Sequence, residues 1–318
     1  MNGDDRPPLA LALAGGNALG AFEAGALAEF TRRGRQARLV AGTSIGSVNA
    51  VLFLSPKNGD PVGTLRTFWD SVAQDVFAFS RQQRERWAGL QTLMLGRPPM
   101  SRSLAPAAAV APYMGVSSLQ DPTPLAATLA KLVDFDALPS RGRLMVATVQ
   151  LNPDREVFFD SAETPLRVEH VLASAALPVF YPPVRIGDHS YVDGGLVANL
   201  PVGPLLAEGE GPLDCIALDL FAGEGPAPKN LGDAAERAQD ALFALQSERA
   251  LREAARATRP IRVIHVPFRP KSPDSALKSF DFSRASLAER WRAGEEAMSR
   301  ALERLERPAE TRPVVERL

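Results

Sequence analysis

At residues 39–50 the chain reads Leu39-Val40-Ala41-Gly42-Thr43-Ser44-Ile45-Gly46-Ser47-Val48-Asn49-Ala50. A short apolar run, a serine between Gly42 and Gly46, and a second apolar run follow one another. This order predicts a strand, a tight turn that carries the serine, and a helix. Glycine is expected on both sides of Ser44 because so tight a turn leaves no room for a Cβ. The helix would direct its free N–H groups towards the Ser44 oxygen.

Two interpretations of this turn are open from these residues alone. The pattern Gly-x-Ser-x-Gly is typical of a nucleophile elbow, in which the serine attacks an acyl carbon. A plain junction of strand, turn and helix with a capping serine has the same pattern. The rest of the chain therefore has to decide between them.

A second turn of the same kind lies near the start of the chain. Gly15-Gly16-Asn17 follows the apolar run Leu9–Ala14 and precedes a helical pattern over Ala18–Arg33. Such a loop is a tight turn, a phosphate cradle or an oxyanion hole, because it presents backbone N–H groups to an anion. The lysine of a P-loop and the acidic residue of a dinucleotide site are both missing, which disfavours phosphate. Since carboxyl ends of parallel strands share one edge, we expect this loop beside Ser44.

The remaining pattern alternates strands with helices. Strands are predicted at Arg38–Ala41, Leu144–Leu151, Glu156–Phe159, Asp214–Leu220 and Ile261–Val266, a hairpin at Val184–Val192, and helices at Pro165–Ala176, Leu231–Thr258 and Ser283–Arg307. This order predicts an α/β fold of three layers, with helices on both faces of a mainly parallel sheet. We expect one domain over residues 1–318, with a helical insertion at 55–140 and a helical carboxyl-terminal extension at 270–318.

The insertion contains many prolines, short helical patches such as Leu65–Trp69 and Trp87–Leu95, and few strand signals. Between Arg81 and Arg102 it has five arginines and one acidic residue, Glu85, interleaved with apolar side chains. One interpretation is a cap helix that packs its apolar face on the core and solvates its charges. The other is a basic amphipathic surface, residues 81–102, that touches anionic lipid headgroups as a peripheral membrane contact.

Composition excludes several classes of function. The 318 residues are 45% hydrophobic and 23% charged with a net charge of −1, so nothing indicates a nucleic-acid partner. The single cysteine, Cys215, lies in an apolar run and is expected to be a buried, inert thiol. The polar residues 1–8 lack a basic segment, and the apolar run after them is too short for a membrane span, which predicts a cytoplasmic protein. We expect no cofactor, and no cluster has the spacing of metal ligands.

Asp193-Gly194-Gly195 follows the predicted hairpin. A carboxylate before two glycines at the end of a strand forms a forced turn. It is either an Asx-turn or a catalytic carboxylate.

Taken together, these motifs resemble the patatin-like phospholipase family, in the family's order. The matching pieces are Gly15–Gly20 as oxyanion loop, Gly42–Gly46 as nucleophile elbow, Ala173–Pro178 with Pro182-Pro183 as helix-to-proline motif, and Asp193–Gly195 as catalytic Asp motif. Asp281-Phe282-Ser283 and the helix through Trp291 and Gly294 resemble the tail of a bacterial branch. The resemblance covers most of the chain, but residues 55–140 match only loosely.

The resemblance implies a serine hydrolase that uses a dyad and acts on lipids or other acyl esters without a cofactor. Ser44 would attack the acyl carbonyl, and Asp193 would accept its proton and later activate water. Gly15, Gly16 and Asn17 would give N–H groups to the oxyanion. Because a free Asp titrates near ~3.9, Asp193 has to be desolvated or paired only with Ser44.

The sequence departs from the family's pattern at two positions. Asn17 stands where the family usually has a third glycine, and asparagine is the least costly replacement if φ is positive there. Leu19 stands where many members have Arg or Lys, although the bacterial branch tolerates leucine.

Two alternatives stay open. In the first, Ser44, Asp193 or Asp219, and His265 form the triad of an α/β-hydrolase, whose chain order they fit. In the second, the protein is a catalytically weak family member that coats lipid granules or membranes. This alternative depends on Asn17, which stands where the family usually has glycine.

Overall fold

In the computed structural model the described residues are 7–78, 80–104, 117–221, 223–225, 227–270, 277–307 and 312–318. The predictions for residues 1–6, and for parts of the segments 55–140 and 270–318, lie outside the described residues.

A nine-stranded sheet with the order β12-β11-β10-β1-β2-β6-β9-β8 forms the centre of the fold, and β7 pairs with β6. Its strands are β1 (Leu9–Leu13), β2 (Leu39–Thr43), β6 (Arg143–Leu151), β7 (Arg155–Asp160), β8 (Val184–Ile186), β9 (His189–Asp193), β10 (Leu213–Asp219), β11 (Ile261–Pro267) and β12 (Val314–Arg317). Strands β12 to β6 run parallel, whereas β7, β8 and β9 pair antiparallel with their neighbours. The prediction of an α/β fold with a mainly parallel sheet is confirmed.

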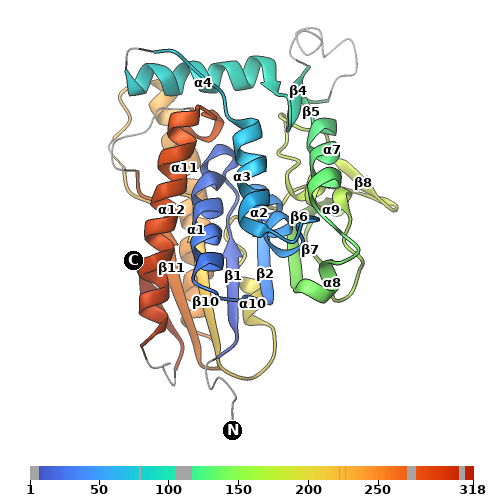
Figure 1. The fold of residues 1–318 in the computed structure, drawn as a ribbon, viewed down its shortest axis with the longest axis vertical. Helices are drawn as coiled ribbons and strands as arrows, with labels where there is room; N and C mark the ends of the chain where they lie inside the picture. The colour runs from blue at the N-terminus through green and yellow to red at the C-terminus, as the bar shows by residue number, and fades with distance from the viewer. Residues whose placement is uncertain are drawn as a thin grey trace.

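Helices cover both faces of this sheet. They are η1 (Asn17–Gly20), α1 (Ala21–Arg32), α2 (Ile45–Leu54), α3 (Pro61–Val72), α4 (Arg81–Leu95), α7 (Thr123–Leu132), α8 (Leu138–Arg141), α9 (Val168–Ser174), η2 (Gly194–Leu196), α10 (Gly203–Leu206), α11 (Leu231–Ala254), η3 (Lys278–Phe280) and α12 (Arg284–Leu305). Figure 1 shows α1, α2, α3 and α12 in front of the sheet, α11 behind it, and α4 lying across the top. Aliphatic and aromatic side chains form a hydrophobic core around the sheet, and strands β1 and β10 are buried along nearly their whole length.

Strand register places the two glycine-containing turns together. Leu13 of β1 pairs with Gly42 of β2 and with Leu218 of β10. The loop after β1 and the turn after β2 therefore leave the same edge of the sheet side by side, as the parallel pattern predicts. The hairpin β8–β9 turns at Gly187 and ends at Asp193, next to Thr148 of β6 on that edge.

Two expectations for the segment 55–140 need correction. It contains a small antiparallel sheet of β3 (Gly96–Arg97), β4 (Ser101–Ser103) and β5 (Gln120–Asp121), which the sequence does not predict because strands of two or three residues leave no periodic signal. Helix α4 also does not pack its apolar face on the core. Trp87 and Met94 are 58% and 55% exposed, while the small residues Ala88 and Gly89 face inward.

A buried polar cluster ties the start of α1 to the helices beside it. The Asn49 amide donates to the Gly20 carbonyl and to a Glu23 carboxylate oxygen, each at 2.9 Å, and accepts from the Trp69 indole at 3.0 Å. Burial raises the pKa of Glu23 well above its ordinary value, because an ionised carboxylate is poorly solvated there. The cluster fixes η1 and α1 relative to α2, the helix that carries the Ser44 turn.

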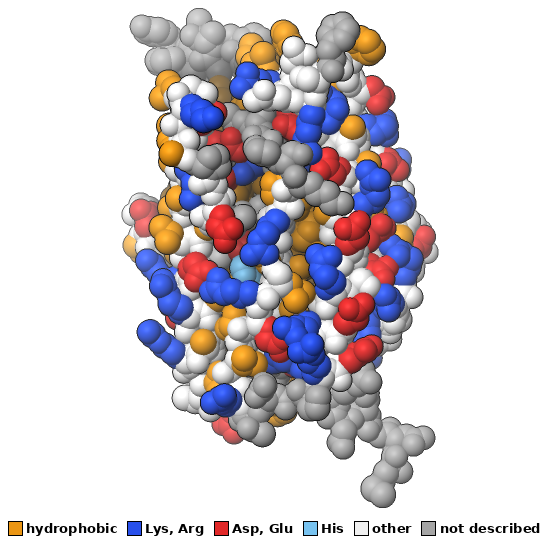
Figure 2. All heavy atoms as spheres, turned by 90° about the vertical axis from the view of Figure 1, so that its left-hand side faces the viewer, with side chains coloured by type: hydrophobic (Ala, Val, Ile, Leu, Met, Phe, Trp, Pro, Cys, Tyr) orange, Lys and Arg blue, Asp and Glu red, His pale blue; other side chains and the backbone are white. Residues whose placement is uncertain are grey.

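The outer surface carries charges of both signs. On the side formed by α11, α12 and β12, Figure 2 shows basic and acidic side chains interspersed, with no large field of one sign. Arg304 pairs with Glu316, and Arg317 with Glu248. Cys215 is buried in β10, as expected. Within the described residues, the helices include none with the length and hydrophobicity needed to cross a bilayer.

Candidate active site

Ser44 occupies a tight and strained turn between β2 and α2. Its backbone has φ 53° and ψ −121°, a conformation that a non-glycine residue rarely adopts. A Cβ added at Gly46 would lie 2.3 Å from the Leu13 carbonyl oxygen, and one at Gly42 would lie 2.8 Å from the Ser47 backbone. The two glycines therefore allow β2, α2 and the end of β1 to approach closely enough to hold the turn.

Two hydrogen bonds from neighbouring segments hold the strained turn in place. The Ser44 N–H donates to the Ser174 hydroxyl oxygen at 2.9 Å, from the last residue of α9. The Thr43 hydroxyl donates to the Ala198 carbonyl at 2.7 Å. Ser174 is fully buried, so its hydroxyl is a fixed acceptor for this N–H.

Asp193 lies within hydrogen-bond distance of the serine. The Ser44 hydroxyl donates to Asp193 Oδ2 at 2.7 Å, and the Gly195 N–H donates to Oδ1 at 2.7 Å. The carboxylate is 3% exposed, and burial raises its pKa to about 6 even though both hydrogen bonds lower it. A Cβ at Gly194 would lie 2.5 Å from the Ala147 carbonyl oxygen, so this glycine lets the Asp193 turn pack against β6.

The loop Gly15–Asn17 lies beside both residues, but its three N–H groups differ. The Gly15 N–H donates to the Asn199 carbonyl at 3.1 Å and is therefore occupied. The N–H groups of Gly16 and Asn17 have no acceptor among the described residues, and both residues line the same pocket as Ser44 and Asp193. The φ of Asn17 is 52°, the left-handed region in which asparagine replaces glycine at least cost.

Asn199, which sequence reasoning missed, joins the glycine loop to the Asp193 turn. Its side-chain amide donates to the Gly15 carbonyl at 3.2 Å, and its backbone N–H donates to Gln246 Oε1 at 3.0 Å. Gln246 in turn donates to the Gly195 carbonyl at 3.2 Å. Ser174 was missed in the same way, although it lies in the helix-to-proline motif. The signal that would have indicated Asn199 and Ser174 is a polar residue within an apolar stretch that lies near a glycine or proline.

The structure does not bring His265 to Ser44. His265 is on β11, and β10 and β1 lie between β11 and the strand of Ser44. Its Nε2 is 3.0 Å from Asp219 Oδ2, and no described contact joins it to Ser44 or Asp193. Leu19 is fully buried and adds no charge to the site. Among the described residues, no group of three or more His, Cys, Asp and Glu side chains could hold a metal ion.

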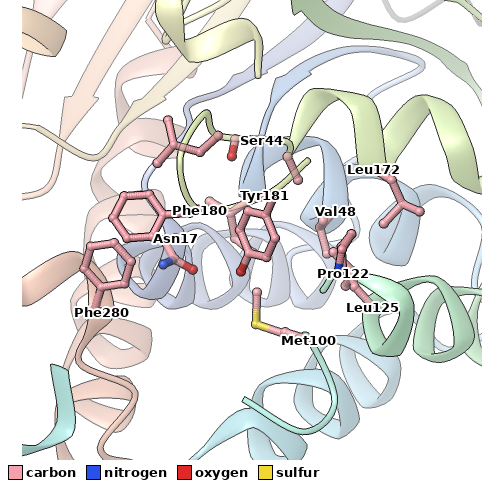
Figure 3. A pocket seen from close by; sticks show the side chains of 13 residues that line it. Asn17, Ser44, Val48, Met100, Pro122, Leu125, Leu172, Phe180, Tyr181 and Phe280 are labelled. Carbon is pink, nitrogen blue, oxygen red and sulfur yellow. The ribbon is translucent and has the colours of Figure 1, made fainter. Parts of the chain in front are cut away.

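Two pockets meet at Ser44. The first, about 540 Å³ including its open mouth, is mainly apolar and lined by Asn17, Ser44, Ile45, Val48, Met100, Pro122, Leu125, Leu172, Ala175, Leu177, Phe180, Tyr181 and Phe280. Figure 3 shows Ser44 at one end of it and Met100, Pro122 and Leu125 at the other. The second, about 410 Å³ including its open mouth, lies over the glycine loop and Asp193 and is also lined by Phe221, Gln239 and Phe243. Ser44 thus lies between an apolar pocket and a more polar one.

Comparison with protein families agrees with this geometry. The sequence model described as patatin-like phospholipase matches residues 11–206, which is more than half of the chain. The match includes Ser44, Asp193 and the glycine loop. Five residues of the site described above lie beyond it: Phe221, Gln239, Phe243, Gln246 and Phe280. The chain belongs to the patatin-like phospholipase family. A second model, described as patatin phospholipase, matches residues 231–313. This range contains α11, β11 and α12. The family resemblance stated from the motifs is confirmed.

Solved structures of two bacterial proteins are similar to this patatin-like chain. VipD from Legionella pneumophila is 14% identical with a TM-score of 0.42, and the match covers 94% of this chain and 67% of VipD. The type III effector ExoU is 14% identical with a TM-score of 0.41, and the match covers 96% of this chain and 54% of ExoU. ExoU in complex with SpcU, from Pseudomonas aeruginosa, is 17% identical with a TM-score of 0.37, and the match covers 96% of this chain and 53% of that one. The chain thus spans about half the length of ExoU. No curated protein sequence matches it.

Proposed function

We propose that this protein is a serine acyl-ester hydrolase of the phospholipase A or lipase type, with Ser44 as nucleophile and Asp193 as base. The observation that carries the proposal is the 2.7 Å hydrogen bond from the Ser44 hydroxyl to a buried Asp193 whose pKa is raised to about 6. At neutral pH this carboxylate is ionised, yet it is a stronger base than an ordinary aspartate. Family membership supports the lipid class of substrate.

In the acylation step, Ser44 transfers its proton to Asp193 Oδ2 as its oxygen attacks the ester carbonyl carbon. The N–H groups of Gly16 and Asn17 stabilise the oxyanion that forms, and such a donor contributes about 10²–10³ in rate. The carbon–oxygen bond to the alcohol breaks as Asp193 returns the proton to the leaving oxygen. The products are a free alcohol and an acyl group on Ser44.

In the second step, water takes the place of the alcohol. Asp193 accepts a proton from this water, whose oxygen attacks the acyl carbon, and the same two N–H groups stabilise the second oxyanion. The bond to Ser44 then breaks, Asp193 returns the proton to the serine oxygen, and a carboxylic acid leaves. The Gly195 N–H keeps Asp193 Oδ2 directed at the serine throughout by occupying Oδ1.

The linings of the two pockets support an assignment of the two halves of the ester. The apolar pocket that extends from Ser44 towards Leu125 and Met100 fits the acyl chain, because its burial there is favourable. The pocket beyond Asp193, with Gln239 and Asn199 in its wall, fits the alcohol and the attacking water.

We also propose that α4 brings this site to a lipid surface. Trp87, Leu90, Met94 and Leu95 are between 45% and 69% exposed, and Arg86 is exposed on the same helix. The side chains of Met100 and Phe280 line the apolar pocket, and α4 contacts η3, which ends at Phe280. Exposed apolar side chains next to a basic one favour the interface of an anionic membrane.

The test is covalent labelling with a fluorophosphonate, which reacts only with an activated serine. Wild-type protein should form one adduct, located at Ser44 by peptide mass, and Ser44→Ala should form none. The same pair is then assayed on p-nitrophenyl esters of increasing length and on phospholipid vesicles. A folded wild-type protein that forms no adduct would instead support the alternative of a lipid-binding or granule-binding scaffold.

A further inference from the structure

Arg290 of α12 is a buried cation that binds backbone carbonyls of two separate segments. It is 3% exposed, and its Nη1 donates to the Ala18 carbonyl at 3.2 Å and to the Asp281 carbonyl at 2.8 Å. Its Nη2 donates to the Lys278 carbonyl at 3.1 Å and lies 3.6 Å from Asp281 Oδ2. Burying a guanidinium is costly unless its N–H groups are satisfied, so these contacts define its position.

Both segments belong to the wall of the candidate active site. Ala18 directly follows Asn17 in η1, and the N–H groups of Gly16 and Asn17 are the two of the glycine loop that have no acceptor among the described residues. Lys278 begins η3, which ends at Phe280, and the Phe280 ring lines both pockets at Ser44. Arg290 thus links η1, which begins at the last residue of the glycine loop, to η3, which contacts η1 and carries Phe280.

We propose that Arg290 is a positioning residue for the acyl-transfer reaction. By binding the Ala18 carbonyl it fixes η1, and so fixes the N–H groups of Gly16 and Asn17 at the point where the oxyanion forms. The proposal rests on the function proposed above. A misplacement of about 1 Å by a distant change costs about 10²-fold in rate, so loss of this anchor has a measurable effect.

The chain offers a matched control for a purely structural role. Arg262 and Asp214 form a second buried pair, with Nη2 2.7 Å from Asp214 Oδ2, and Arg262 also donates to the Leu305 and Arg307 carbonyls. Arg262 and Asp214 lie near the amino-terminal ends of β11 and β10, whereas Ser44 follows the carboxyl-terminal end of the parallel strand β2. Removing either pair takes the same kinds of charged group out of the protein interior, but only Arg290 binds η1, through the Ala18 carbonyl.

Two double variants separate positioning from stability. Arg290→Met alone leaves the Asp281 carboxylate buried beside no cation, which destabilises the fold. Arg290→Met with Asp281→Asn removes both charges and keeps the side-chain volumes similar. Arg262→Met with Asp214→Asn does the same at the control pair. Arg290→Lys keeps a cation beside Asp281 but lacks the guanidinium fork that reaches several carbonyls at once.

Three quantities are measured for each variant: the thermal midpoint, the second-order rate of fluorophosphonate labelling at Ser44, and hydrogen–deuterium exchange over residues 17–24. We expect the Arg290/Asp281 double variant to be labelled at least about 10-fold more slowly than wild type. Its amides in η1 and the first turn of α1 should exchange faster. The Arg262/Asp214 double variant should be labelled within about twofold of wild type, even with a lower midpoint, and Arg290→Lys should fall in between.

The proposal is wrong if the Arg290/Asp281 double variant has the labelling rate and the amide exchange rates of wild type. It is also wrong if labelling of the Arg262/Asp214 double variant is slowed to the same extent. If the Arg290/Asp281 double variant does not fold, the labelling rate of Arg290→Lys is the test. A labelling rate equal to that of wild type would then count against the proposal. If wild type itself forms no adduct, the proposed function fails. The exchange data then still report whether Arg290 holds the glycine loop.

Discussion

Ser44 and Asn17 are non-glycine residues held at positive φ, 53° and 52°, on adjoining turns of one site. Such conformations cost about 1–3 kcal/mol each and persist only where the surroundings fix them. Ser44 is fixed by its hydrogen bond to Ser174 and by the close approach of Gly46 to Leu13. The strain at Ser44 directs its side chain out of the turn, towards Asp193.

Asn17→Gly separates the role of the Asn17 side chain from that of its N–H. Glycine adopts positive φ readily and keeps the N–H, so we expect kcat/KM within about threefold of wild type and a stability change below about 1 kcal/mol. The measurement is ester hydrolysis together with urea unfolding. A loss above 100-fold would mean that the side chain itself takes part.

Asp193→Asn should raise stability while it removes activity. Between pH 3.8, the ordinary value, and about 6, the folded chain holds this proton and the unfolded chain does not. Stability therefore falls as the pH rises through this window, by about 3 kcal/mol in all. Urea unfolding at pH 7 should show Asp193→Asn to be more stable than wild type, and the difference should vanish near pH 4. An unchanged or lower stability at pH 7 would contradict the raised pKa.

At the scale of single residues, local sequence patterns predict part of the candidate site. Gly-x-Ser-x-Gly and Asp-Gly-Gly have local patterns, so Ser44 and Asp193 were predictable as a pair that topology brings together. The occupied N–H of Gly15, bound to Asn199 across 184 residues of chain, has no local pattern. Only the folded path of the chain after β9 decides which amides of the loop remain free.

Between elements, the crossing of α1 and α12 is the contact most sensitive to one added carbon. A Cβ at Gly25 would lie 2.0 Å from the Trp291 carbonyl oxygen, and one at Gly294 would lie 1.9 Å from that of Phe22. Both neighbours are backbone atoms, so no side-chain rotation relieves the clash. The two helices therefore touch through their glycines, and α12 is held in the layer that carries Arg290.

Gly294→Ala should destabilise the fold by about 3 kcal/mol, because α1 and α12 have to separate to admit the methyl group. Gly203→Ala is the matched control: Gly203 is also helical, and nothing lies within 4 Å of its added Cβ. This control should be neutral or slightly stabilising. Urea unfolding of both variants gives the comparison, and equal stability of the two would exclude the close crossing.

The long elements were predictable and the short ones were not. Strand β10 and helix α11 have clear apolar patterns, and their predicted bounds, Asp214–Leu220 and Leu231–Thr258, differ from the observed ones by a few residues. Helix α4 was predictable as a helix, but its orientation was not. Its inward face is formed by Glu85, Ala88, Gly89 and Thr92, and Gly89 allows the close approach to Leu277. A pattern of hydrophobic residues alone assigns the opposite face.

At the scale of the whole molecule, three parts of the chain complete one site. The sheet edge supplies Ser44 and Asp193, the segment 55–140 supplies Met100 and Leu125, and the carboxyl-terminal part supplies Phe280. Helix α4, on which Trp87 and Met94 are exposed, lies at the same end of the molecule as β4 and β5 (Figure 1), and Met100 directly precedes β4. The interfacial role proposed for α4 requires this arrangement.

Replacing Trp87, Leu90 and Met94 by serine should lower hydrolysis of anionic phospholipid vesicles by at least about 10-fold, since each buried apolar side chain contributes about 1.5–3 kcal/mol to interfacial binding. Hydrolysis of a soluble short ester should stay within about twofold of wild type. The control replaces two exposed leucines of α11, Leu242 and Leu245, by serine. Equal losses on vesicles and on the soluble ester would argue against an interfacial role for α4.

The proposed dyad of Ser44 and Asp193 is tested most directly by kcat/KM on a soluble short ester from pH 4.5 to 9, for wild type, Asp193→Asn and His265→Ala. We predict that the wild-type value falls below a single ionisation near pH 6, which is the raised pKa of Asp193. His265→Ala should keep this profile, and Asp193→Asn should lose about 10³-fold or more. Turnover that survives in Asp193→Asn and disappears in His265→Ala would contradict the dyad.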